Sequence, residues 1–433
     1  MKTRIMFCSV VLMFSVLSGN AFGSTEGPSN NFFGNYAGAN VAGSEQNNTF
    51  IGGYAGQATT TGDDNTFIGK MAGQFTTTGN DNTFLGAYAG WQNITGIANV
   101  CVGVGAGDGN SGGSYNTFLG TNAGYVNTTG NFNTFVGLQA GQSNTTASGN
   151  TFSGTFAGFT NTTGAGNSFT GYQAGYANTT AGYNTFNGYQ AGYKNTTGER
   201  NSFIGYATGY QNTTGRYNTF LGYGSGWGNT TGNNNTFFGY TTGYKTTTGS
   251  NNLYLGNFAG YENTTGIGNI FLGYNAGRNE TGSGKLYIAN SSTATPLIYG
   301  DFSARTVHIN GTLTQSSSRE YKDNIQDLSK EEALTTLAGL TPVKYVYKSD
   351  RTENHVGFIA EDVPELVATK DRKGLSSLDI VSVLTRVVQD QQRVNEEQQQ
   401  RIQKQEEMNA ALSEKIAKLE QMMTMTKAVS RAD

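Results

Sequence analysis

The chain has 433 residues, of which 62 are glycine, 4 are proline and 2 are cysteine, and its formal net charge is −3. A mildly acidic chain with an isoelectric point near 5.6 lacks the basic surface that nucleic-acid binding requires, so no nucleic-acid partner is expected. The sequence also contains no cofactor or metal motif, and we expect neither.

Residues 1–24 are typical of a secretory signal peptide. Basic Lys2 and Arg4 precede an apolar run over residues 5–17, and small residues follow at 21–23. We therefore expect an exported protein, secreted or held at the cell surface. Removal of this leader leaves Cys101 alone, which excludes a disulfide within the mature chain. No other apolar run is long enough to span a membrane.

Residues 25–284 repeat with a period of 17. A glycine recurs from Gly52 to Gly273 without a slip, which gives fourteen copies of a unit close to N-T-F-I-G-x-x-A-G-Y-x-N-T-T-G-x-x, and a looser copy surrounds Gly34. A fixed period this short indicates one small unit stacked on itself. We predict a β-solenoid, or β-roll, with two short strands and two turns in each rung.

Three columns in the repeat predict how the rungs stack. An asparagine stands four residues before every repeated glycine, from Asn48 to Asn269, and stacked amides can hydrogen-bond between rungs. Two residues later comes a phenylalanine in most copies, which suits the interior. The next residue, as in Ile51 or Leu85, then points to the opposite face of the strand. This apolar stripe predicts contact with a partner chain, despite interruptions at residues 153, 170 and 187.

Aromatic residues form two further columns. We call the first the corner column; it comprises Phe159, Tyr176, Tyr193, Tyr210, Trp227, Tyr244 and Tyr261. The second, the flank column, comprises Tyr172, Tyr189, Tyr206, Tyr223 and Tyr240. Exposed columns could bind a cell-surface or glycan ligand by stacking on sugar rings, whereas buried ones would be trimer core. The structural interpretation is favoured.

The N-T-T triplet matches a glycosylation sequon in eight copies, which begin at Asn127, Asn144, Asn161, Asn178, Asn195, Asn212, Asn229 and Asn263. In a bacterial protein these residues are turn chemistry, since Asn and Thr side chains bind the backbone ahead of a glycine. The regular threonines also allow a different hypothesis, a hydroxyl face that binds ice.

Residues 285–316 read as a β connector that caps the open end of the solenoid, with short strands near 285–289, 296–302 and 307–311. Residues 317–378 follow with a different composition. They contain the run from Ser317 to Ile325, a capping-box helix start at Ser329 and Glu332, a strand over 343–347, and the run from His355 to Pro364.

This order of elements resembles the C-terminal intramolecular chaperone domain of endosialidase-type phage tailspikes, a family of self-cleaving serine peptidases. The resemblance covers about residues 316–425. It implies that the domain trimerises, templates the folding of the preceding fibre and then cuts itself off. The family's serine, lysine and histidine correspond to Ser317, Lys322 and His355. The family usually has Asp after its serine, where this sequence has Ser318.

The residues themselves are compatible with that chemistry. A serine hydroxyl becomes a nucleophile when a base accepts its proton, and a lysine can do so when burial or a neighbour lowers its pKa. Without the resemblance, residues 316–318 read equally well as a flexible hinge and Lys322 as a solvated charge. His355 is as readily a structural histidine as a catalytic one.

Residues 379–425 predict a three-stranded coiled coil, and 426–433 a disordered tail. The apolar positions are spaced mostly by three and four, with Gln391, Gln398 and Gln405 in core slots. The repeats themselves loosely resemble the heads of trimeric autotransporter adhesins, which share the N-S-x-x-I-G strand. The expected fold class is thus mainly β: a solenoid fibre, a small α+β domain and a coiled coil.

Together these features predict an exported homotrimeric fibre, of surface-adhesin or tail-fibre type, that carries a chaperone domain able to cleave itself once. The alternative is an ice- or glycan-binding solenoid with a permanent trimerisation foot.

Overall fold

The computed structural model describes residues 30–42, 46–348 and 350–429, so the predicted signal peptide lies outside the described residues. The chain divides into two compact units, and the boundary between them falls after Leu313. Each unit is described by itself below. Among the described residues, no helix combines the length and the apolar character needed to cross a membrane.

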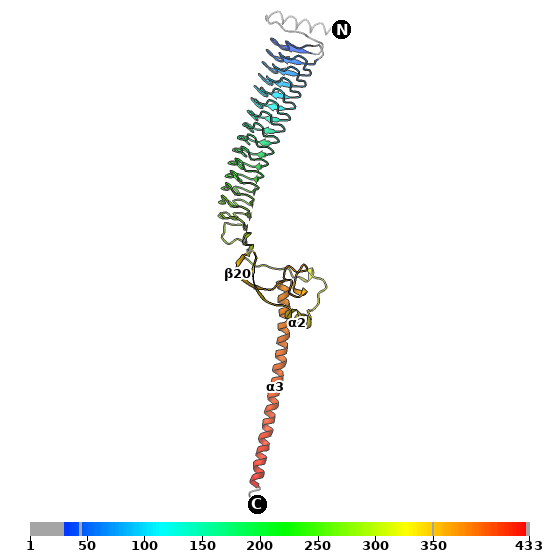
Figure 1. Ribbon diagram of the computed structural model, residues 1–433, viewed down its shortest axis with the longest axis vertical. Helices are drawn as coiled ribbons and strands as arrows, with labels where there is room; N and C mark the ends of the chain where they lie inside the picture. Colours follow the sequence, from blue (N-terminus) through cyan, green and yellow to red (C-terminus); the bar gives the residue numbers. More distant parts are fainter. Residues whose placement is uncertain (1–29, 43–45, 349, 430–433) are drawn as a thin grey trace, which may run out of the picture. The chain divides into compact units, whose positions relative to one another are not determined.

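The first unit is a β-solenoid whose rungs stack in one direction, drawn from blue to green in Figure 1. Each rung contributes one strand of three residues: Asn31–Phe33 (β1), Thr49–Ile51 (β2), Thr66–Ile68 (β3), Thr83–Leu85 (β4), Val100–Val102 (β5), Thr117–Leu119 (β6), Thr134–Val136 (β7), Thr151–Ser153 (β8), Ser168–Thr170 (β9), Thr185–Asn187 (β10), Ser202–Ile204 (β11), Thr219–Leu221 (β12), Thr236–Phe238 (β13), Leu253–Leu255 (β14) and Ile270–Leu272 (β15).

The strands pair in parallel with equivalent residues opposite one another, as Phe186 of β10 lies opposite Phe203 of β11. The 17-residue solenoid is therefore confirmed, but the expectation of two strands per rung is wrong. After the strand each rung turns at a glycine of positive φ, such as Gly154 at 143°, and runs back through turns. Those turns still bond to the next rung, since Gly158 N–H donates to the Ala174 carbonyl at 2.9 Å.

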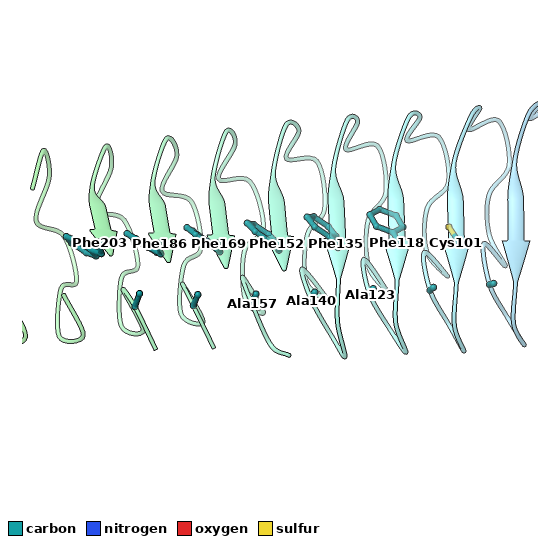
Figure 2. Close-up of a cluster of buried hydrophobic side chains, with 14 of the residues drawn as sticks. Cys101, Phe118, Ala123, Phe135, Ala140, Phe152, Ala157, Phe169, Phe186 and Phe203 are labelled. Carbon is teal, nitrogen blue, oxygen red and sulfur yellow. The ribbon is translucent and has the colours of Figure 1, made fainter. Parts of the chain in front are cut away.

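The phenylalanine column fills the solenoid interior, as Figure 2 shows. Phe152, Phe169 and Phe186 are fully buried, and neighbouring rings stack 4.8 Å apart. Small residues oppose them, because a Cβ on Gly158 would lie 2.5 Å from the Phe152 ring. Cys101 takes one place in the column, and burial raises the pKa of its thiol.

Two ladders of buried asparagine bind the rungs together. In the predicted one, the strand ladder, Asn65 N–H donates to Asn48 Oδ1 at 2.9 Å, and Asn65 Nδ2 donates to the Gly79 carbonyl at 2.8 Å. The asparagines of the N-T-T triplets form a second, the turn ladder. In it Asn144 Nδ2 donates to Asn127 Oδ1 at 2.7 Å.

The turn ladder decides between turn chemistry and glycosylation for the eight triplets. All eight asparagines are fully buried, and their amide nitrogens already donate hydrogen bonds within the solenoid. A glycan has no access to a side chain in this position. The triplets are therefore structural.

A short antiparallel meander follows the last rung. Lys285–Ile288 (β16) still pairs in parallel with β15, whereas Ile298–Asp301 (β17) and Thr306–Ile309 (β18) reverse direction. Lys285 Nζ lies 2.5 Å from Asp301 Oδ2 across β16 and β17, and this contact lowers the pKa of the Asp301 carboxyl to about 2. These strands agree with the predicted connector.

The second unit is small and mixes helix with strand. Its elements are the 3-10 turn Arg319–Tyr321 (η1), the helix Lys330–Ala338 (α2), the strands Val343–Tyr347 (β19) and Asp350–Gly357 (β20), the 3-10 turn Glu365–Val367 (η2) and the helix Ser377–Val429 (α3). The capping box expected at Ser329 is present. The core consists of Ala333, Val363, Val367 and Val383.

Helix α3 has two parts with different surroundings (Figure 1). Its first turns pack Ile380, Val383 and Val387 into the core of the unit, and Lys330 Nζ of α2 lies 2.6 Å from Asp390 Oδ2. From Ile402 to Met425 the large apolar side chains are exposed. The helix continues through residues 426–429, which the sequence analysis assigned to a disordered tail, since neither Gly nor Pro interrupts it.

Candidate self-processing site and aromatic columns

The turn η1 brings Ser317 and Lys322 together. Ser318 caps the turn, because its Oγ accepts a hydrogen bond from Glu320 N–H at 3.2 Å. The chain then bends back, and Lys322 Nζ donates to Ser317 Oγ at 2.6 Å. A nucleophile and a base within hydrogen-bonding distance are the minimal parts of a serine–lysine site.

This pair is open to water in the single chain. Ser317 and Lys322 are both exposed, as are the residues from 307 to 327 on either side of them. A lysine acts as a base only as the neutral amine, which exclusion of water favours. Ser317 and Lys322 are therefore close enough for proton transfer, but the described part of the single chain does not shield them from water.

His355 is placed differently. It lies on β20, where its ring stacks on Tyr345 of β19 at 5.6 Å and meets the Tyr347 ring edge-on at 5.1 Å. The hydroxyls of the two tyrosines lie 3.5 Å apart, and this hydrogen bond raises the pKa of Tyr345. Among the described residues, no hydrogen bond joins His355 to Ser317 or Lys322. The structure thus brings two of the three predicted site residues together.

The aromatic columns on the solenoid are ordered stacks. In the flank column Tyr189 and Tyr206 stack 5.0 Å apart with an interplanar angle of 4°, and both are exposed. In the corner column Tyr193 and Tyr210 also stack 5.0 Å apart and are half-buried. Burial in this column raises the pKa of Tyr193 and Tyr244.

This stacking changes what the columns can bind. Neighbouring rungs cover the ring faces, so a sugar ring cannot stack on them between one rung and the next. The columns present ring edges and phenol hydroxyls instead. The first threonine is also engaged in seven of the eight triplets, as Thr145 Oγ1 donates to the Thr162 carbonyl at 3.0 Å. Neither continuous sugar stacking nor a free hydroxyl face for ice is favoured by these contacts.

Fold and site together define a repeat β-solenoid followed by a small α+β unit with a serine–lysine pair at its start. Residues 317–370 match the family model described as the chaperone of endosialidase, which confirms the resemblance for this segment. The match begins at Ser317 and ends before α3. It indicates a fibre protein with a C-terminal folding domain. No curated protein and no solved structure matches the chain.

Proposed function

We propose that the chain is an exported trimeric fibre protein whose C-terminal unit directs folding and trimerisation and then severs itself from the fibre at Ser317. One observation carries this proposal. The family match begins at a serine that accepts a hydrogen bond from Lys322, four residues beyond the last residue of the solenoid unit, Leu313. A cut here would fall three residues inside the second unit but before its first element, η1, so it would leave the solenoid and every helix and strand of the second unit whole.

Trimerisation is supported by apolar surface that a single chain leaves uncovered. On the solenoid, the apolar stripe formed by the residue after each core phenylalanine is exposed at Ile51, Leu85, Ile204, Phe238 and Leu255. Helix α3 exposes Ile402, Leu412, Ile416 and Leu419. Contiguous apolar surface of this kind is typical of association sites, and apolar residues repeated at three- and four-residue spacing favour a coiled coil.

A buried polar atom in the second unit also supports association with a second chain. Arg386 on α3 lines a cavity of about 480 Å³ together with Asp327 and Gln389. Its Nε atom is buried, and the described chain offers it no hydrogen-bond acceptor. Such an atom is costly to leave unpaired, and an acceptor from a second chain would satisfy it.

The proposed cleavage uses the Ser317–Lys322 pair after assembly encloses it. Neutral Lys322 takes the Ser317 proton while Oγ attacks the Ser316 carbonyl carbon, and the peptide nitrogen leaves with the proton that Lys322 returns. The resulting ester is hydrolysed by water. The products are a carboxyl end at Ser316 and a released segment that begins at Ser317 with its hydroxyl restored.

Intact-mass measurement of the purified protein tests the proposal. We expect the wild type to give two fragments divided within residues 316–318, and Ser317→Ala and Lys322→Ala each to give one uncut chain that still trimerises. Lys322→Arg should also stay whole, since a guanidinium keeps its proton. Ser316→Ala is the matched control and should be cut, because it removes a neighbouring hydroxyl and leaves the pair.

Ser318→Asp introduces the residue usual in the family and a good cap for η1, so we expect faster cleavage. If wild type and Ser318→Asp both remain whole for days as folded trimers, the peptidase proposal is wrong and the C-terminal unit is a permanent foot.

A further inference from the structure

The C-terminal end of the first unit contains a small cavity with a mixed polar and apolar lining. It has a volume of about 190 Å³, and its walls come from the last rung, at residues 277–280, from Tyr287 of β16, and from the loop residues 292–294. Pockets for drug-sized ligands measure roughly 300–1,000 Å³. A cavity of this size suits one ring-sized group.

Arg278 is held rigidly in this cavity. It takes the position that follows Tyr261 in the corner column, where the repeat carries an aromatic residue in the preceding rungs. Its guanidinium lies 5.0 Å from the Phe258 ring centre and 5.2 Å from that of Tyr261. Its Nη1 donates to Asn275 Oδ1 at 3.0 Å. The rings and the amide therefore fix the plane of the guanidinium before any ligand arrives.

The positive charge of Arg278 has no carboxylate partner in the described chain. Glu280, the carboxylate in the cavity wall, is already engaged: it accepts from Gly282 N–H at 2.7 Å and from the Tyr287 hydroxyl at 2.8 Å. Burial and the contact with Glu280 raise the pKa of Tyr287, which keeps this hydroxyl protonated. A guanidinium with free N–H groups binds a planar anion through two parallel hydrogen bonds.

The rest of the lining is rich in hydroxyl and amide groups. Asn279 Nδ2 donates to Ser292 Oγ at 3.2 Å, and Thr293 Oγ1 lies 3.2 Å from Thr295 Oγ1. Gly277, Ala294, the Tyr287 ring and the aliphatic parts of the other side chains add apolar surface of about the same extent as the polar surface. Hydroxyl and amide groups around a fixed cation, beside the Tyr287 ring and other apolar surface, suit a ligand with many hydroxyls, one acid group and an apolar ring face.

We propose that this cavity binds one acidic sugar unit of a polysaccharide, with its carboxylate paired to Arg278 and its ring hydroxyls bonded to Asn279, Ser292 and Thr293. This inference rests on the proposed function in one respect, since an exported fibre would meet such polymers outside the cell. The first unit alone, through the last rung and the meander that follows it, supplies every residue of the site.

Calorimetric titration of the full-length protein tests the site with tetrasaccharides of galacturonate, glucuronate and mannuronate. We expect at least one of them to bind. Its methyl ester has the same sugars without the charge, and it should bind at least about tenfold more weakly. Acetate serves as the small-anion probe and should bind far more weakly than the tetrasaccharide. Equal binding of acid and ester, acetate binding as tight as the sugar, or binding by none of the three would overturn the proposal.

Substitutions assign the binding to this cavity. Arg278→Gln should weaken binding of the acidic tetrasaccharide roughly 10–100-fold, and Arg278→Lys should weaken it less, because the charge remains while the paired donors are lost. Lys245→Gln is the matched control. Its ammonium also lies over Tyr261, at 5.5 Å, but it is already paired with Glu262 at 2.8 Å, so binding should not change.

Ser292→Ala and Thr293→Ala, in a loop, give a second route if Arg278→Gln fails to fold. Each should weaken binding several-fold without moving the melting temperature. Equal losses in Lys245→Gln and Arg278→Gln would contradict the site. Cleavage and trimer state measured on the same samples report separately on the proposed function.

Discussion

Asn229 and Thr246 mark the place where the turn ladder breaks. Asn229 Oδ1 is buried and has no hydrogen-bond donor within the described chain, because the next rung carries Thr246 where the preceding rungs carry asparagine. An unpaired buried acceptor costs about 1–3 kcal/mol. Thr246→Asn should supply the missing donor and raise the melting temperature by a few degrees in calorimetry.

Thr248→Asn is the control for that change, since it adds the same amide at an exposed position two residues along the turn. It should leave the melting temperature within experimental error. A Thr246→Asn protein that melts at or below the wild-type temperature would contradict the account of the ladder.

Asp108 gives the solenoid a pH-dependent weakness. Only 8% of this residue is exposed, and its burial raises the pKa of the carboxyl to about 6. Below about pH 4 the group is protonated in both the folded and the unfolded chain, so it does not lower the free energy of unfolding. As the pH rises through 6, the unfolded chain loses the proton more readily, so stability falls.

Asp108→Asn should remove that loss. We expect its melting temperature to equal the wild-type value at pH 4 and to exceed it at pH 8. Parallel pH profiles for Asp108→Asn and the wild type would refute the assignment.

The positions of individual residues were predictable where the same residue type recurs at one place in every repeat. The strand ladder and the phenylalanine core follow from period alone, because a residue that recurs every 17 positions meets its own copies. The turn ladder was missed, since N-T-T is a turn signal in isolation and its amide bonds exist only between rungs. The Arg278 cavity was missed as well, because it needs Tyr287 and a loop that lie outside the repeat.

At the scale of the elements, composition predicted two strands in each rung, and only one of them forms. The N-T-F-I-G segment forms its predicted strand, whereas the A-G-Y-x-N-T-T-G segment forms turns, because positive φ at glycines such as Gly158, at 59°, prevents extension. The second unit followed its local signals more closely. A capping box begins α2 where expected, and β19 has the predicted bounds.

The self-processing site was predictable in part because two of its residues are close in the sequence. Ser317 and Lys322 lie five residues apart on one tight turn, so sequence spacing alone brings them into reach. His355 stands on a hairpin strand, and its distance from the pair depends on how loops fold or on contacts with other chains. Spacing along the sequence carries no such information.

For the whole molecule, the apolar stripe of α3 predicts a stable trimer. Multi-angle light scattering of the uncut Ser317→Ala protein should give three times the mass of the chain at micromolar concentration. Ile402→Asp should dissociate the trimer or lower its melting temperature, because it places a charge on the stripe. Gln403→Asp introduces the same charge one residue away and should leave the trimer intact. A monomeric wild type would refute trimerisation.

The register of the strands also constrains how this protein can change in length. Every ladder requires each side chain to face its own copy in the next rung, as Thr185 faces Ser202 and Phe186 faces Phe203. An insertion of one full repeat preserves all of these contacts, whereas an insertion of one residue within a strand moves the phenylalanines out of the interior. One extra residue outside the strand is tolerated, since Phe32 faces Phe50, which lies 18 positions further on. Gene duplication can therefore lengthen or shorten the solenoid only in whole steps, each about 4.8 Å, the spacing of paired strands.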